Sequence, residues 1–179
     1  ELRARVSRER AAGGVVIGSL PHGHTFQRLQ DIRGYENLVF DMLDEEPRLA
    51  RLLEMVEAFN CRYVMNWLEL APDIMSYPED LGMQVGPMIS PALFRKYIKP
   101  VYRRLMKPAR DRGCLVHMHS DGDIRTLAGD LVEGGVDIIN LQDLVNGIDW
   151  IRDNFAGRVC IDLDIDRQSV TRFGTPAQI

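Results

Sequence analysis

Short apolar runs alternate along the chain with longer segments in which apolar residues recur at helical spacing. Val15 to Leu20 is the first such run and is bounded by glycines, which is typical of a short buried strand. From Pro47 the apolar residues fall three or four positions apart, which predicts a helix that reaches about Leu70. The same pattern predicts strands at residues 15–20, 72–77, 114–119, 137–141 and 158–163.

A second long helix is predicted from Pro91 to Arg112. Ser90 supplies an N-cap hydroxyl and Pro91 takes the first helical position, which together indicate a helix start. Pro100 interrupts this run, but the apolar stripe continues beyond it. Because an interior proline removes only one backbone hydrogen bond, we expect Pro100 to kink the helix rather than end it. Shorter helices are predicted near residues 1–12, 124–131 and 148–155.

Strands that alternate with helices predict βαβ units and a parallel α/β sheet. Two architectures fit this pattern: a five-stranded doubly wound sheet, or an eight-stranded barrel, which typically needs ~250 residues. The chain starts at Glu1 and ends on a turn followed by Pro176, which favours an incomplete barrel. We therefore expect one partial barrel domain over residues 1–179, in which the five strands are parallel neighbours.

Charge, composition and absent motifs narrow the class of protein. The 22 basic and 26 acidic side chains give a net charge of −4 without a long Lys/Arg tract, which argues against nucleic-acid or membrane partners. No apolar run approaches the roughly 20 residues that span a bilayer. Three widely spaced cysteines predict no disulfide framework and favour a cytoplasmic location. Glycine-rich nucleotide loops and the Gly-x-Ser-x-Gly elbow are absent from the sequence.

Polar and ionisable side chains follow nearly every predicted strand, at the end where (β/α) proteins gather their active groups. Helix faces do not explain such periodic placement. The pattern therefore predicts a functional face at the carboxyl ends of the strands. Its members are His22, His24, Glu79, Asp80, the segment 119–123, Gln142, Asp143, Asp164 and Asp166.

The segment from His117 to Asp121 is the densest of these groups and allows three interpretations. Alternate strand residues share a face, so His117 and His119 are able to chelate one ion. Equally, His119 and Asp121 at the strand tip supply an imidazole and a carboxylate. In a purely structural interpretation, Asp121 and Gly122 form a turn and a helix cap, and His119 bonds to the backbone.

Two further groups leave alternatives open. His22 and His24 lie in a loop with Pro21 and Gly23, where they either contact a ligand or are merely exposed. Glu79 and Asp80 form either an acid/base pair, whose mutual repulsion raises one pKa, or a cap with a solvated neighbour.

Several segments, taken in order, resemble the uroporphyrinogen decarboxylase superfamily, which includes the decarboxylase and the methylcobamide-dependent methyltransferases. The resemblance runs from about residue 15 to 179 and implies a (β/α)8 TIM barrel, of which the chain is a middle-to-late stretch. The matching segments are 33–38 (RGYENL), 79–84 (EDLGMQ) with 89–91 and 99–102, 119–123 (HSDGD), and 165–168 (IDRQ) with 173–176 (FGTP).

Two positions bring the chain closer to the methyltransferase branch. The true decarboxylase has Asp-Gly at the strand tip without the preceding His, and an Asn-Leu-Asp-Pro closing turn; this chain departs from it at both places, with His119 and with residues 165–167 (IDR). The methyltransferases hold zinc at the strand tip through His-x-Cys; His119 matches the His, and Asp121 stands in place of the Cys. A carboxylate is also a zinc ligand.

The resemblance implies methyl transfer between a corrinoid protein and a small acceptor. Zinc would be held by His119 with Asp121 and a third ligand, for which Glu79 is the first candidate and Asp80 or a residue beyond 179 are the alternatives. Asp80 and Asp121 would be the catalytic carboxylates. The residues expected to line the substrate pocket are His22, His24, Gln84, Gln142, Asp166 and Gln168.

Two other functions remain open at this point. One is metal-free decarboxylation of a porphyrinogen in tetrapyrrole biosynthesis, with Asp80 and Asp121 under the tetrapyrrole. The other is a non-catalytic barrel that binds a ligand or partner. Association into an oligomer is compatible with each of these functions.

Overall fold

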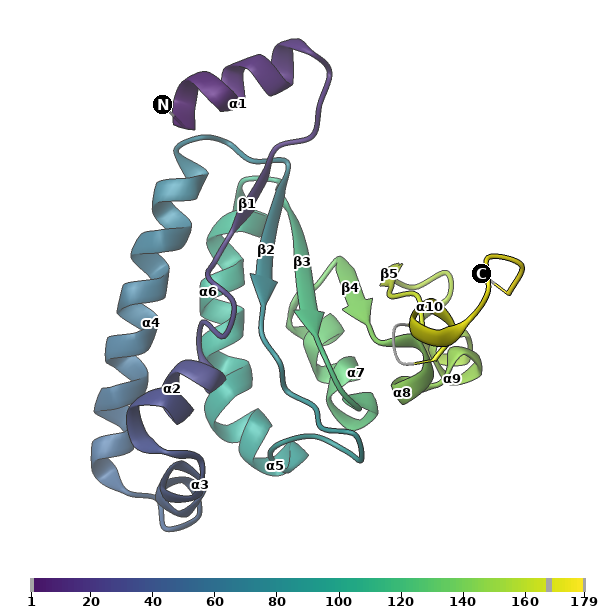
Figure 1. Ribbon diagram of the computed structural model, residues 1–179. Helices are drawn as coiled ribbons and strands as arrows, with labels where there is room; N and C mark the ends of the chain where they lie inside the picture. Colours follow the sequence, from purple (N-terminus) through teal and green to yellow (C-terminus); the bar gives the residue numbers. More distant parts are fainter. Residues whose placement is uncertain (1, 167–168, 179) are drawn as a thin grey trace.

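The computed structural model describes residues 2–166 and 169–178 and shows five strands with helices between them (Figure 1). The strands are β1 (Ile17–Ser19), β2 (Ile74–Pro78), β3 (Leu115–Ser120), β4 (Ile138–Leu141) and β5 (Cys160–Leu163). The helices are α1 (Leu2–Ala11), α2 (Phe26–Arg33), α3 (Tyr35–Leu43), α4 (Pro47–Leu68), α5 (Pro91–Leu93), the π-helical turn η1 (Phe94–Ile98), α6 (Lys99–Asp111), α7 (Arg125–Gly134), α8 (Asp143–Asn146), α9 (Ile148–Phe155) and α10 (Val170–Phe173). None of the helices in the described ranges has the length and apolar character that a membrane crossing requires.

The sheet keeps one strand order from β1 to β5, and every neighbouring pair is parallel. A doubly wound sheet reverses its strand order at a switch point, whereas a barrel adds each strand beside the last one. The structure is therefore a stretch of a (β/α) barrel, and the predicted parallel neighbours are confirmed. β3 has the predicted length and is shifted by one residue, and the other four strands are shorter than predicted; the first is Ile17–Ser19 rather than residues 15–20.

The two faces of the sheet differ in character because side chains alternate along each strand. Tyr77, Val116 and Met118 are fully buried in the core that the sheet forms with the helices. His117 and His119 lie between these positions on β3 and point to the opposite, partly exposed face. Helices α4 and α6 lie side by side against the buried face (Figure 1). The polar side chains His117 and His119 thus lie on the face of the sheet that α4 and α6 do not cover.

The long helical segment after β2 runs through Pro100, as predicted. Ser90 caps its start, since the Ser90 hydroxyl accepts a hydrogen bond from the Leu93 amide at 3.3 Å. The segment passes from α5 through the π-helical turn η1 into α6, so Pro100 lies in the first turn of α6. A π turn is one of the recognised ways in which a helix accommodates a local break in its hydrogen-bond ladder.

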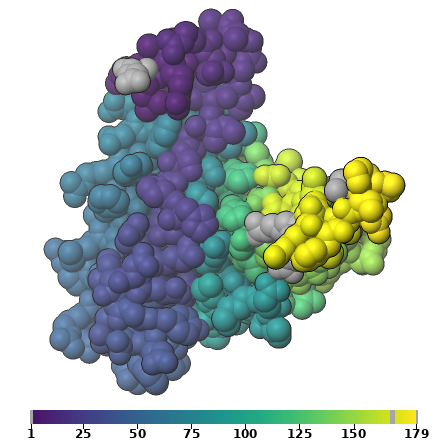
Figure 2. Space-filling view, viewed as in Figure 1, coloured from purple at the N-terminus to yellow at the C-terminus, as the bar shows by residue number. Residues whose placement is uncertain are grey.

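The segment from β5 onward stands out from the rest of the molecule (Figure 2). β5 is the last strand of the sheet, and Cys160, Asp162 and Leu163 on it are exposed. This part of the chain makes a smaller contribution to the core than β2, β3 and β4 do.

Candidate functional site

Three ionisable side chains meet at the carboxyl ends of β1, β2 and β3. His22 Nε2 lies 3.3 Å from Asp80 Oδ1, and His119 Nε2 lies 3.5 Å from the same oxygen. One ligand atom from each residue lies within 4.8 Å of the other two, which is close enough for all three to hold a single metal ion. We refer to His22, Asp80 and His119 as the His–Asp–His cluster.

Asp121 borders this cluster and fixes the position of Asp80. Its carboxylate Oδ1 lies 3.6 Å from His119 Nε2. Its backbone amide donates a hydrogen bond to Asp80 Oδ1 at 3.1 Å. The structure therefore brings together Asp80, His119 and Asp121, three of the residues that the sequence assigns to the site.

Asn140 on β4 determines which nitrogen of His119 faces the cluster. The Asn140 Nδ2 amide donates to the Asp162 carbonyl at 2.9 Å and to Asp164 Oδ1 at 3.2 Å, which identifies its nitrogen. Asn140 Oδ1 therefore faces His119 Nδ1, and this nitrogen must carry the donated proton. The lone pair of neutral His119 is then on Nε2, the atom that faces Asp80. Such a partner orients a metal-binding imidazole.

The site favours a positive charge between His119 and Asp80. Hydrogen bonding with His119 lowers the pKa of Asp80 to about 2, and the same interaction raises the pKa of His119 to about 8. A neutral His119 would direct its Nε2 lone pair at the lone pairs of a carboxylate, which is repulsive. A proton or a metal ion at Nε2 removes that repulsion.

The loops that carry Asp80 and Asp121 cross at two glycines. The Gly82 amide donates to the Asp121 carbonyl at 3.2 Å. A Cβ on Gly82 would lie 2.6 Å from the Gly122 carbonyl carbon and 2.7 Å from the Asp123 amide nitrogen, so only glycine fits without a shift. This close crossing holds the two carboxylates beside each other.

Glu79 does not join the cluster, contrary to its predicted role as a metal ligand. Adjacent residues point in opposite directions at the end of a strand, so Glu79 turns into the interior while Asp80 faces the site. Its fully buried carboxylate accepts hydrogen bonds from the Thr25 and Gln27 amides, at 2.8 and 2.9 Å, and from the Tyr102 hydroxyl. Burial raises the pKa of Glu79 to about 7. Glu79 thus anchors the loop that follows His22.

His24 does not line the pocket either, because its side chain is fully buried. Its Nδ1 bonds the Thr25 hydroxyl at 2.6 Å, and its Nε2 lies 3.9 Å from Glu79 Oε2. Asn60 on α4 holds the His24 carbonyl through a hydrogen bond of 2.6 Å. Burial lowers the pKa of His24 to about 3, so the ring is neutral at physiological pH. Its role is to fix the loop, not to contact a ligand.

His117 and His119 share a face of β3, as predicted, but they belong to different groups. His117 Nδ1 bonds the Ser76 hydroxyl at 2.9 Å, and its Nε2 bonds Asp162 Oδ2 at 3.1 Å. Both of its nitrogens are therefore engaged away from the His–Asp–His cluster. The interpretation in which His117 and His119 chelate one ion does not hold.

The remaining predicted pocket residues occupy different positions. Gln142 is buried, and its Oε1 accepts a hydrogen bond from the Gly122 amide at 2.6 Å, so it supports the turn instead of lining a pocket. Asp166 accepts from the Ser169 and Val170 amides, which stabilises the start of α10. Gln84 is exposed in the loop after β2. Gln168 lies outside the described residues.

Two residues that position groups of the site, Asn140 and Tyr102, are not among those predicted from the sequence. Asn140 is a polar residue within an otherwise apolar strand (IINL), at the alternate position that faces the histidines. A polar residue at such a position of an apolar strand indicates a residue of the site. Tyr102 lies within the apolar stripe of α6, where an aromatic residue is typical of the core, and only the fold shows its hydroxyl at Glu79.

The parallel sheet keeps one strand order, which defines a stretch of a (β/α) barrel. Its ionisable groups lie at the carboxyl ends of neighbouring strands, where such barrels carry their active sites. The family model described as uroporphyrinogen decarboxylase (URO-D) matches residues 29–177. The chain therefore belongs to the uroporphyrinogen decarboxylase family, whose members are enzymes, either decarboxylases or methyltransferases. Comparison with curated proteins gives no match.

Proposed function

We propose that this chain carries the metal site of a methyltransferase of the family, which moves a methyl group between a corrinoid protein and a small acceptor. The observation that supports it is the convergence of His22, Asp80 and His119 on one point. The choice of a methyltransferase over a decarboxylase also rests on His119, which matches the zinc-binding His of the methyltransferase motif.

The donor atoms of the cluster fit a zinc ion. Catalytic zinc takes three protein ligands from His, Asp, Glu or Cys and keeps one position open. Donors ~2.0–2.1 Å from one tetrahedral zinc stand roughly 3.3 Å apart. The two distances from Asp80 Oδ1, to His22 Nε2 and His119 Nε2, are 3.3 and 3.5 Å. Asn140 keeps the His119 lone pair on the atom that would bind the ion.

The residues of the chain prepare the site for a small nucleophile. A zinc ion in such a site lowers the pKa of a bound thiol or hydroxyl. Asp121, beside His119, takes up the proton that the acceptor loses. The corrinoid of a partner protein would supply the methyl group to the deprotonated acceptor, with the bonding electron pair remaining on its cobalt. His22, half-exposed at the mouth of the cluster, is the ligand nearest to solvent.

Metal analysis of two histidine variants tests this proposal. His119→Ala is expected to lose bound zinc and methyl transfer from methylcobalamin to a small thiol. His117→Ala is the matched control, because it removes an imidazole from the same face of the same strand but outside the cluster. Zinc is expected to remain bound in that variant.

Three results would contradict the proposal. Equal zinc content in wild type and His119→Ala would exclude the cluster as the metal site. Equal loss of zinc from His119→Ala and His117→Ala would indicate a general effect on the fold, which the melting temperatures of the two variants would also show. Turnover of a porphyrinogen by the metal-free protein would favour the decarboxylase function instead.

A further inference from the structure

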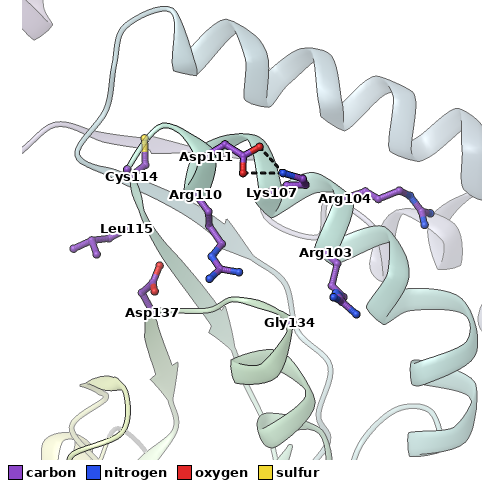
Figure 3. Close-up of a pocket in the computed structure, with 10 residues that line it drawn as sticks. Arg103, Arg104, Lys107, Arg110, Asp111, Cys114, Leu115, Gly134 and Asp137 are labelled. Carbon is purple, nitrogen blue, oxygen red and sulfur yellow. Dashed lines mark hydrogen bonds and ion pairs between the residues drawn. The ribbon is translucent and has the colours of Figure 1, made fainter.

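A cavity lies at the opposite end of the sheet from the His–Asp–His cluster, where β3 and β4 begin (Figure 3). Its volume is about 730 Å³, within the range of small-molecule sites. One wall of the cavity is α6, and the other is formed by the end of α7 and the middle strands of the sheet. The lining residues are Arg103, Arg104, Lys107, Arg110, Asp111, Gly113, Cys114, Leu115, Gly134 and Asp137. We call it the basic groove.

Two arginines of the basic groove have no anionic partner among the described residues. Lys107 pairs with Asp111 at 2.6 Å, and Arg104 turns to Glu57 on α4 at 2.6 Å. For Arg103 and Arg110, the described ranges 2–166 and 169–178 contain no hydrogen bond or ion pair of their side chains. The groove is therefore positive although the whole chain has a net charge of −4.

The acids of the groove are already engaged, so they do not neutralise these two arginines. The Asp137 carboxylate Oδ2 accepts a hydrogen bond from the Val116 amide at 2.9 Å, and Asp111 is held by Lys107. Two guanidinium groups are thus left with free N–H donors on one side of α6. They are seven residues apart, which is about two helical turns, and so they share one face of the helix.

Two glycines at the end of α7 make room for the arginines. A Cβ on Gly135 would lie 2.9 Å from Arg110 Cζ, so the guanidinium rests against the glycine backbone. A Cβ on Gly134 would lie 3.8 Å from Arg103 Cγ. Figure 3 shows Arg110 directed toward Asp137 and Arg103 directed toward Gly134, both on the groove side of α6. The groove is shaped around these two side chains.

We propose that the basic groove binds a small organic molecule with two anionic groups, phosphate or carboxylate, held by Arg103 and Arg110. The planar guanidinium fork matches both anions with two parallel hydrogen bonds. The site is independent of the metal function because it lies at the other end of the parallel strands.

Calorimetric titration with two probes tests the proposal and identifies the anion. Inorganic pyrophosphate represents the phosphate class and succinate the carboxylate class. The protein is first treated with EDTA and then dialysed free of it, so that no metal at the His–Asp–His cluster captures either probe and no chelator competes for the groove. We expect one probe at least to bind with a stoichiometry of one. The tighter probe identifies the class of the natural ligand.

The double variant R103A/R110A is expected to weaken binding about 100-fold or more, because each of the two lost guanidinium groups contributes about tenfold or more through its charged hydrogen bonds. The matched control is R5A/R8A, which removes two exposed arginines of α1 and the same amount of charge. Its binding is expected to equal that of wild type. R103K/R110K keeps the charge and loses the forks, and it should also bind more weakly.

Two results would overturn the proposal. One is the absence of saturable binding of either probe to the wild-type protein. The other is equal weakening in R103A/R110A and R5A/R8A, which would reduce the effect to net charge. Circular dichroism of all variants separates loss of binding from loss of fold.

Discussion

The crossing of Gly82 and Gly122 predicts that a single methyl group there disrupts both stability and the site. In Gly82→Ala the new Cβ would meet three backbone atoms at 2.6–2.8 Å, from Gly122, Asp123 and Asp121. Backbone atoms cannot rotate away as a side chain does, so the loops must separate. Overpacking of this kind costs about 1–3 kcal/mol.

Gly122→Ala is expected to cost more. Its Cβ would lie 2.7 Å from Gly82 Cα, and its backbone φ of +80° is unfavourable for alanine by about 1–2 kcal/mol. Overpacking and backbone strain together should lower the free energy of unfolding of Gly122→Ala by roughly 2–5 kcal/mol. Because the same loops carry Asp80 and Asp121, both variants should also bind zinc more weakly than wild type.

Two glycine controls isolate the effect of the crossing. Gly86 has a φ of +90° but no atom within 4 Å of a new Cβ, so Gly86→Ala measures backbone strain alone. Gly129 lies inside α7 with equally open surroundings, and Gly129→Ala should stabilise the protein by about 0.5–1 kcal/mol. Urea unfolding measures the free energy of unfolding of all four glycine variants. A Gly82→Ala variant as stable as wild type, with unchanged zinc affinity, would refute the close crossing.

Three further predictions concern the groups around the cluster. Asn140→Ala should weaken zinc binding about 10–100-fold in a metal titration, because His119 loses the partner that orients it; an unchanged affinity would remove Asn140 from the site. Tyr102→Phe should lower the free energy of unfolding by about 1–3 kcal/mol in urea, since it takes a donor from a buried carboxylate. Burial raises the pKa of Glu79 from 4.5 to about 7, so the folded protein holds this proton more tightly than the unfolded chain. Stability should therefore fall by on the order of 3 kcal/mol as pH rises from 4.5 to 7, and Glu79→Gln should lack this slope; parallel curves for the two proteins would contradict it.

The alternation of strands and helices was predictable because parallel strands are buried on one or both faces and read as short apolar runs. The capped start at Ser90 and the continuous helix through Pro100 follow from local chemistry alone. The choice between a doubly wound sheet and a barrel needed the strand order. Nothing in the pattern of a single strand reports which side its neighbour takes.

The site was predictable in outline because the strand-end rule brings His22, Asp80 and His119 to one edge. Which of the two candidate acids, Glu79 or Asp80, faces the site was not predictable, since the last residue of a strand determines which of two adjacent side chains points there. His24 shows the same limit: two loop histidines look alike in sequence, and only packing against α4 buries one of them.

X-ray absorption at the zinc edge, on the wild-type protein after zinc loading, tests the metal site most directly. The structure predicts a shell of nitrogen and oxygen atoms at ~2.0–2.1 Å with outer-shell scattering from two imidazoles. That imidazole scattering should fall in His22→Ala and persist in His117→Ala, and His119→Ala should retain no bound zinc. A protein that binds no zinc, or a spectrum without imidazole scattering, would contradict the assignment of His22, Asp80 and His119 as the ligands.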